Sequence, residues 1–277
     1  MRIRSHLRPG LCAAAFLFAI ASNAATRGPK QGTLVIVGGG QLGPEIIQRF
    51  VQLAGGKDAN FVVIPTASEE PTIDLEKTKE RFAKQFGVTN VTVLHTKDRK
   101  VADSKQFTEP LRHASAVWIP GGRQWRLADS YLNTRTEKEI KNVLKRGGVV
   151  GGSSAGATIQ GSYLVRGAVE GNTIMMSPGH EAGFALLTDS AIDQHIITRH
   201  READLDPVVE KFPRLLGIGI DEGTAIVVHG ESFEVIGKSK VAIHDGREHE
   251  GKKFYFLTAG QKYDLKHRAV MAAAGDR

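Results

Sequence analysis

The chain has very little cysteine, with Cys12 the single one among 277 residues. A mature form without the N-terminal segment therefore has no disulfide and no cysteine nucleophile, and roughly 250 residues can bury a sufficient core without cross-links. Beyond that segment there is no apolar run long enough to cross a membrane. There is also no long basic run of the kind that binds nucleic acid. We expect the mature chain to have neither a nucleic-acid partner nor a membrane contact.

Residues 1–24 have the composition of a secretory signal peptide. Three arginines within the first eight residues precede an apolar stretch from Leu11 to Ala21, and small residues follow at 22–24. That stretch is shorter than the ~20 residues that span a bilayer, so we predict cleavage near Ala24 or Ala25 rather than a retained anchor. Loss of three arginines from the total of 37 basic residues leaves 34 against 30 acids, a net charge of +4. The mature protein is expected to be secreted or periplasmic.

Short apolar segments alternate with helix-like segments in the first half of the mature chain. The predicted strands are Thr33–Val37, Phe61–Ile64, Val91–His95, Ala116–Ile119 and Gly148–Val150, and the predicted helices are Pro44–Ala54, Leu75–Phe86 and Thr136–Lys145. Alternation of this kind indicates βαβ units. The strands are rich in β-branched residues and lack strict polar alternation, which suits a parallel sheet covered on both faces. We predict a doubly wound α/β fold.

Past Gly161 the pattern changes to strands joined by short turns. These are predicted at Thr224–Val228, Phe233–Ile236, Val241–His244 and Phe254–Leu257. We expect them to extend the same sheet in antiparallel fashion within a single domain over residues 25–268. Residues 269–277 are small and polar and are expected to form a flexible tail.

The sequence Gly152-x-Ser154-x-Gly156 lies between an apolar run and a helix start. It fits the G-x-S-x-G nucleophile elbow, in which small neighbours allow a serine on a very sharp turn. The elbow would project the Ser154 hydroxyl from the end of the sheet and direct the N–H of Ala155 at a developing oxyanion. The alternative is a plain turn of small residues where a helix packs closely on a strand.

A serine nucleophile requires a base, and the base requires an orienting group. His95 ends a predicted strand at the same edge of the sheet, and His180, His195 and His200 follow the elbow in irregular segments. His195 is the strongest candidate because it ends the polar triplet Asp193-Gln194-His195, for which packing alone has no need. A solvated loop with scattered charges is the alternative interpretation.

Two basic residues and two acids complete the candidate set. Arg199 and Arg201 stand at alternating positions after His195 and would face one anionic group. Asp221 and Glu222 close the apolar run at 215–220, and either carboxylate would hold an imidazole in its working tautomer. A turn capped by acids remains open as an alternative. The order serine, histidine, acid differs from the serine, acid, histidine order of α/β-hydrolases.

A second oxyanion donor is expected after the strand at 116–119. Gly121 and Gly122 follow Pro120 there, and glycines expose backbone N–H groups that bind anions well. Gln124 adds a side-chain amide. An ordinary loop start would read the same way.

Residues Gly38 to Gly43 fit the G-x-G-x-x-G pattern of dinucleotide-binding folds. The pattern is weak here, because Glu45 would put an anion beside the pyrophosphate and no acid ends the second strand to hold a ribose. The glycines are otherwise interpreted as a tight turn at the carboxyl edge of the first strand, or as part of a pocket wall at that edge.

Together these residues resemble one family. The motifs that carry the resemblance are Pro120-Gly121-Gly122-x-Gln124, Gly152-x-Ser154-Ala155-Gly156-Ala157, Asp193-Gln194-His195 and Gly219-Ile220-Asp221-Glu222. They are similar to those of cyanophycinases, serine peptidases grouped with aspartyl dipeptidase (peptidase E), and occur in order over about Thr33 to Ile243. The resemblance implies a flavodoxin-like, doubly wound, mostly parallel sheet with helices on both faces and an antiparallel C-terminal extension, related to class I glutamine amidotransferases with serine replacing their cysteine.

The resemblance also implies roles for individual residues. Ser154 is then the nucleophile, His195 the general base and Glu222 the orienting acid, while Gly122 and Ala155 supply the oxyanion N–H groups. The residues implied in substrate binding are Gln124, Asp193, Gln194, Arg199 and Arg201. No metal or cofactor is needed, and the family suggests a homodimer.

The implied substrate is a cyanophycin-like aspartyl polymer that is cut to β-Asp-Arg dipeptides. One residue departs from the family, because Asp204 stands where its basic run continues with a further arginine. A reversed charge there would weaken the binding of an anionic group by about 1–3 kcal/mol if both are desolvated. The alternatives are an α-aspartyl dipeptidase and a non-catalytic secreted protein that binds acidic peptides on the same fold.

Overall fold

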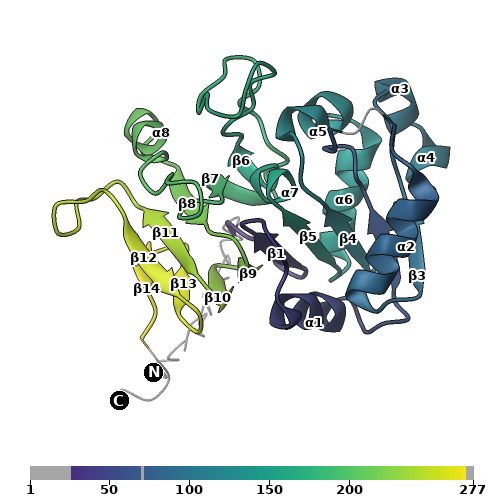
Figure 1. Ribbon diagram of the computed structural model, residues 1–277, viewed down its shortest axis with the longest axis horizontal. Helices are drawn as coiled ribbons and strands as arrows, with labels where there is room; N and C mark the ends of the chain where they lie inside the picture. Colours follow the sequence, from purple (N-terminus) through teal and green to yellow (C-terminus); the bar gives the residue numbers. More distant parts are fainter. Residues whose placement is uncertain (1–25, 70–71, 273–277) are drawn as a thin grey trace, which may run out of the picture.

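The computed structural model describes residues 26–69 and 72–272, which form two packed sheets with helices around them (Figure 1). The larger sheet has nine strands in the order β14-β13-β10-β9-β1-β5-β4-β2-β3. Its strands are β1 (Thr33–Val37), β2 (Asn60–Val63), β3 (Asn90–Val93), β4 (Ala116–Ile119), β5 (Val149–Ser153), β9 (Thr224–His229), β10 (Ser232–Gly237), β13 (Lys262–Asp264) and β14 (Ala269–Val270). Strands β1, β5, β4, β2 and β3 are mutually parallel, so the predicted doubly wound α/β fold is confirmed.

The C-terminal strands divide between the two sheets. Strands β9 and β10 continue the large sheet in antiparallel fashion, as expected, and β13 and β14, which were not predicted, extend it further. A second sheet has the order β12-β11-β8-β7-β6. Its strands are β6 (Gly161–Tyr163), β7 (Leu187–Gln194), β8 (Leu216–Ile220), β11 (Lys240–His244) and β12 (Tyr255–Thr258). The predicted strands at Val241–His244 and Phe254–Leu257 therefore belong to a separate sheet, because β11 pairs with β8, and β12 pairs with β11, rather than with the β9–β10 hairpin.

The ends of the chain bear on two further expectations. The predicted signal peptide, residues 1–24, lies outside the described residues. At the other end, Ala269 and Val270 pair with Asp264 and Tyr263 as β14, so regular pairing continues two residues past the expected domain end.

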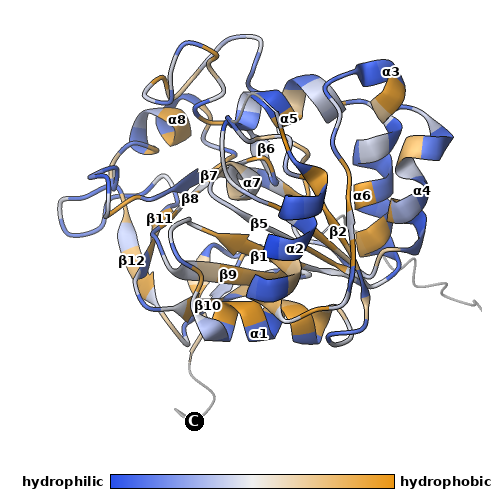
Figure 2. Ribbon diagram, turned by 45° about the vertical axis from the view of Figure 1, so that its right-hand side comes forward, coloured by the Kyte–Doolittle hydropathy of each residue, from blue (hydrophilic) through white to orange (hydrophobic). Residues whose placement is uncertain are grey.

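The helices cover the large sheet on both faces. They are α1 (Pro44–Leu53), α2 (Leu75–Phe86), α3 (Arg99–Ala102), α4 (Lys105–His113), α5 (Gln124–Tyr131), α6 (Arg135–Lys145), α7 (Ala155–Thr158) and α8 (Asp206–Lys211). On one face, α1 and α2 contribute Phe50, Phe82 and Phe86 to an aromatic cluster around Trp118. Figure 2 shows α1 turning its hydrophobic side to the strands, while the outer side of α2 is hydrophilic.

The opposite face carries α4, α5 and α6 and, beside them, the second sheet. One continuous core joins Leu34 and Ile36 of β1 to Ile192 of β7 and Ile218 of β8. Alternate residues of β1, Val35 and Val37, belong to the core on the α1 side, as the two-residue period of a strand requires. Because the second sheet packs here, the carboxyl ends of β7 and β8 come close to the carboxyl end of β5.

Candidate active site

Ser154 lies on a strained turn between β5 and α7. Its backbone has φ 56° and ψ −113°, a conformation that non-glycine residues seldom adopt. The turn closes because its neighbours have no side chains: a Cβ on Gly152 would lie 2.3 Å from the oxygen of Gly156, and one on Gly156 would lie 1.8 Å from the oxygen of Ile119. The side chain of Ser154 remains partly exposed. This geometry is that of a nucleophile elbow.

A hydrogen-bonded line runs from Ser154 through His195 to Glu222. The Ser154 Oγ lies 2.9 Å from His195 Nε2, and His195 Nδ1 lies 2.6 Å from Glu222 Oε1. His195 follows β7 and Glu222 follows β8, so both come from the second sheet. A carboxylate on Nδ1 keeps the proton there and leaves Nε2 as an acceptor facing the serine. The three residues thus have the arrangement that base-assisted nucleophilic attack requires.

The glycine-rich turn after β1 packs against the side chains of His195 and Glu222. A Cβ on Gly39 would lie 2.2 Å from His195 Cε1, and one on Gly40 would lie 2.6 Å from Glu222 Oε2. The backbone oxygens of Gly38 and Gly39 accept hydrogen bonds from the N–H groups of His195 and Gly223, both at 2.9 Å. Of the readings left open for residues 38–43, the tight turn therefore fits the structure.

The dinucleotide reading of the same turn does not fit. The carboxylate of Glu45 folds back over the start of α1, because a Cβ on Gly43 would lie 2.4 Å from Glu45 Oε1. That is the place a pyrophosphate would take at a helix N-terminus, and a carboxylate there repels a phosphate.

Asp221, the other acid of the pair, holds the segment after His195. Its Oδ1 accepts hydrogen bonds from the N–H groups of Ile197 and Thr198, and its Oδ2 accepts one from the Ser239 hydroxyl. Burial opposes the charged form, but these hydrogen bonds outweigh it and hold the pKa of Asp221 below its ordinary value. Asp221 therefore supports the loop that carries the histidine, while Glu222 contacts the ring.

The surroundings of His195 favour its neutral form. Burial lowers its pKa below the ordinary 6.5, Glu222 opposes this shift, and the positive charges of Arg199 and Arg201 reinforce it. A neutral imidazole accepts a proton at neutral pH, which a general base must do.

The other candidate histidines lie away from Ser154 or are bonded to other residues. His95 lies 2.9 Å from the Thr66 hydroxyl, and His180 bonds Asp129 at the same distance, while His200 is exposed. His195 is the candidate that the structure brings to Ser154.

The expected oxyanion donors flank the nucleophile. A Cβ on Gly121 would lie 3.2 Å from Ser154 Cβ, so the turn after β4 contacts the serine directly. Gly122, with φ 138°, follows at once, and a side chain there would overlap the oxygen of Ala67. Ala155 is the first residue of α7, and the first N–H groups of a helix have no partner within it. The turn after β4 and the start of α7 thus both adjoin Ser154, and the oxyanion role of the Gly122 and Ala155 N–H groups stays a prediction.

The comparisons with known proteins agree with this geometry. The model of Peptidase family S51 matches residues 34–236. The cyanophycinase of Geminocystis herdmanii is 34% identical, with 87% of this chain and 97% of that protein covered, and the cyanophycinase of Trichormus variabilis is 30% identical, with 87% and 88% covered.

The chain belongs to peptidase family S51. It is therefore a serine-type peptidase, a hydrolase, and the resemblance to cyanophycinases is confirmed.

Solved structures agree in fold. A peptidase from an acI-B1 Actinobacterium superposes with a TM-score of 0.65 at 25% identity, covering 86% of this chain and 98% of that one. A putative peptidase E protein from Listeria monocytogenes, at 19% identity and a TM-score of 0.55, covers 75% of this chain and 99% of that one and shows the fold alone.

The residues that the family resemblance implied in substrate binding are not equally accessible. Arg199 is exposed and Arg201 partly so. The amide nitrogen of Gln124 is buried and donates to the oxygen of Val165 at 2.9 Å. Gln194 is buried, and its Oε1 lies 3.4 Å from Arg201 Nη1. Gln124 thus ties the turn after β4 to the long β6–β7 connection, which rises above α7 in Figure 1.

Asp193 and Asp204 are both bound to a residue that the motifs did not single out, Arg166. Asp193 is buried and forms a bidentate pair with this guanidinium, while Asp204 bonds its Nη2. The expected penalty of Asp204 on anion binding is therefore reduced, since Arg166 compensates its charge. A lone arginine in the apolar stretch 163–169 was the available sign of such a pair, because buried arginines are almost always paired.

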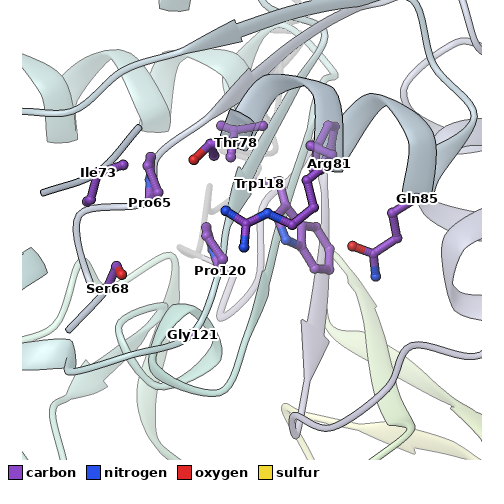
Figure 3. A pocket seen from close by; sticks show the side chains of 11 residues that line it. Pro65, Ser68, Ile73, Thr78, Arg81, Gln85, Trp118, Pro120 and Gly121 are labelled. Atoms are coloured by element: carbon purple, nitrogen blue, oxygen red, sulfur yellow. The ribbon is translucent and has the colours of Figure 1, made fainter. Parts of the chain in front are cut away.

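A cavity adjoins the turn that contacts Ser154. It has a volume of about 240 Å³ and is lined by Pro120 and Gly121 on one side and by Arg81 of α2 on the other, with Trp118 also lining it (Figure 3). The guanidinium of Arg81 extends toward Pro120 in this view. The cavity, with an apolar wall and the cation of Arg81, thus shares Gly121 with the turn that contacts Ser154.

Residues 26–69 and 72–272 contain neither a metal-binding cluster nor a membrane-spanning helix. No group of three or more histidine, cysteine, aspartate or glutamate side chains could hold a metal ion there. No helix in the same part of the chain is long and apolar enough to cross a membrane.

The contact between Gly39 and His195 gives a first prediction. Gly39→Ala would drive a methyl group into the imidazole and displace it from Ser154, so we expect labelling of Ser154 by a fluorophosphonate probe to fall at least about tenfold, as a misplaced catalytic group implies. Gly55→Ala is the matched control, since Gly55 has a similar φ of 99° but nothing within 4 Å of its Cβ. Equal labelling of the two variants would contradict the proposal that the turn at Gly39 positions the His195 ring.

The electrostatics of His195 give a second prediction. Because its pKa lies below 6.5, the labelling rate should stay high at neutral pH and fall only as the pH drops through that lower pKa and the base is protonated. Arg199→Gln removes one positive charge, so the midpoint of this acid limb should move to higher pH. The measurement is the labelling rate against pH for both proteins, and a shift to lower pH in the variant would refute the assignment.

Proposed function

We propose that this protein is a secreted cyanophycinase-type peptidase that hydrolyses aspartyl-linked amide bonds through an acyl-enzyme. The observation that carries the proposal is the hydrogen-bonded line Ser154–His195–Glu222 in a chain 34% identical to a cyanophycinase. The two exposed or partly exposed arginines after the histidine give the site a positive charge, which suits a substrate that carries carboxylates.

The chemical steps follow from the geometry. Ser154 Oγ transfers its proton to His195 Nε2 and attacks the substrate carbonyl carbon, and the N–H groups of Gly122 and Ala155 stabilise the resulting oxyanion. The C–N bond then breaks, and the leaving amine takes the proton from His195. Water, deprotonated by the same histidine, attacks the ester carbonyl, and the Ser154 oxygen takes that proton back as the acid product leaves. Glu222 stabilises the imidazolium that forms in each half.

The substrate that fits best is a polymer with an aspartate backbone, of the cyanophycin kind, cut to β-Asp-Arg dipeptides. The free carboxylate of a side-chain-linked residue would bind Arg199 and Arg201. The cavity beside Gly121 has room for a neighbouring part of an extended chain. The relatives named cyanophycinases support this choice.

Hydrolysis of defined substrates tests this function. The wild-type protein should release β-Asp-Arg from the polymer, detected by mass spectrometry, and Ser154→Ala should lower the rate at least about a thousandfold with an unchanged melting temperature. Release from α-aspartyl dipeptides instead would identify an α-aspartyl dipeptidase. A protein that binds the polymer but neither cleaves it nor reacts with the probe would be a binding protein only.

We also propose export with removal of residues 1–24, supported by the basic, apolar and small-residue segments in that order. The full chain is expressed in a Gram-negative bacterium, and the protein is recovered from the periplasm or the medium. Its intact mass should match a chain that begins at Ala25 or Thr26. Recovery of the uncleaved chain in the cytoplasm would overturn this proposal.

A further inference from the structure

Arg166 is a deeply buried charged group near the site, at 1% exposure. It follows β6 in a left-handed backbone conformation with φ 56°, which is strained for an arginine. Its Nε and Nη2 bond the two oxygens of Asp193 at 2.8 and 2.9 Å, and Nη2 also bonds Asp204 at 2.5 Å. Its Nη1 donates to the oxygen of Asn172. One guanidinium thus holds two carboxylates and the β6–β7 connection.

Arg201 lies beside the same two carboxylates. Its Nη1 is 3.4 Å from the side chain of Gln194, the residue after Asp193, and its carbonyl accepts from the N–H of Asp204. Burial and the positive charge of Arg166 lower the pKa of Arg201, whereas the negative charges of Asp193 and Asp204 raise it. Yet in the part of the chain that the structure describes, the ion pairs of Asp193 and Asp204 are with Arg166 and none is with Arg201. Arg166 therefore occupies the acids that would otherwise attract Arg201.

We propose that Arg166 is a positioning residue that keeps Arg201 free to bind a substrate carboxylate, by holding Asp193 and Asp204 in an internal ion cluster. The proposal rests on the proposed function and narrows its substrate class. With both acids engaged, the site recognises the carboxylate of the side-chain-linked residue and not a cation on it. Without Arg166, two carboxylates would lose their ion pair, one of them fully buried, and Arg201, whose charge both acids already influence, would be drawn to them.

The charge reading is tested with substrates that differ in one group. Aspartyl oligomers carrying side-chain-linked arginine are compared with the same oligomers carrying citrulline, an uncharged isostere, or arginine amide, which lacks the carboxylate. For the wild type we expect citrulline to change kcat/KM by less than about fivefold, the effect of an exposed charge pair. The amide should lower kcat/KM by about tenfold or more, as loss of a charged hydrogen bond does. A strong preference for arginine over citrulline would overturn the proposal.

The positioning role is tested with a loss and a rescue. Arg166→Gln should raise KM for the carboxylate substrate about tenfold and reduce the preference over the amide, because Arg201 is captured by the freed acids. Adding Asp193→Asn and Asp204→Asn to this variant removes the competitors and should restore KM. A purely structural role predicts that the triple variant is worse than the single one. Arg49→Gln, which removes a surface ion pair with Glu234, is the control.

A measurement independent of hydrolysis separates this proposal from the function it rests on. Phenylglyoxal modification of Arg201, followed by peptide mass mapping, should be fast in the wild type and the triple variant and slow in Arg166→Gln. Equal rates in all three would overturn the proposal, whether or not the protein cleaves any aspartyl substrate.

If Arg166→Gln does not fold, Asp204→Asn replaces it. The side chain of Asp204 is 38% exposed. Removing its negative charge should lower KM for the carboxylate substrate, and a raised KM would refute the proposal.

Discussion

The contact between the Gly38–Gly40 turn and the His195–Glu222 pair is the interaction on which the site depends. Ser154 stands at the end of the large sheet, whereas its histidine and acid stand at the ends of β7 and β8 in the second sheet. Two backbone hydrogen bonds and the absence of side chains at Gly39 and Gly40 let the two edges meet. The short distances from Ser154 to His195 and from His195 to Glu222 depend on this contact between the two sheets.

Charge is arranged around this contact in two groups. Close to the nucleophile, burial and two arginines hold His195 neutral, and Glu222 limits that effect. Farther out, the buried Arg166 pairs with both the buried Asp193 and the partly exposed Asp204. A buried charge is tolerated only when it is paired and hydrogen-bonded, which explains why Arg166 and Asp193 occur together. Arg199, which is exposed, and Arg201, which is partly exposed, carry positive charge on the solvent side of the site.

Much of the fold was predictable because its elements depend on local patterns. The strand at 33–37, the helix at 75–86 and the strand at 116–119 were predicted within a residue of their observed bounds or at them, since short β-branched runs and amphipathic spacing reflect local preference. The division of the C-terminal strands was not predictable in this way. Val241–His244 reads as a strand in either sheet, and its pairing with Leu216–Ile220 is a long-range choice.

The sequence by itself determined the chemical groups of the site. The strained turn at Ser154 needs Gly152 and Gly156 beside it. Largely apolar strands end in the polar residues Asp193-Gln194-His195 and Asp221-Glu222. The reason is that sterics and strand ends act over a few residues. Only the tertiary structure decided which acid contacts the histidine, that residues 38–43 hold the histidine rather than a nucleotide, and that Asp193 is bound to Arg166 and so withdrawn from the substrate. Those outcomes depend on which charges and surfaces meet when two sheets pack, and residues 27 to 182 positions apart in the chain meet there.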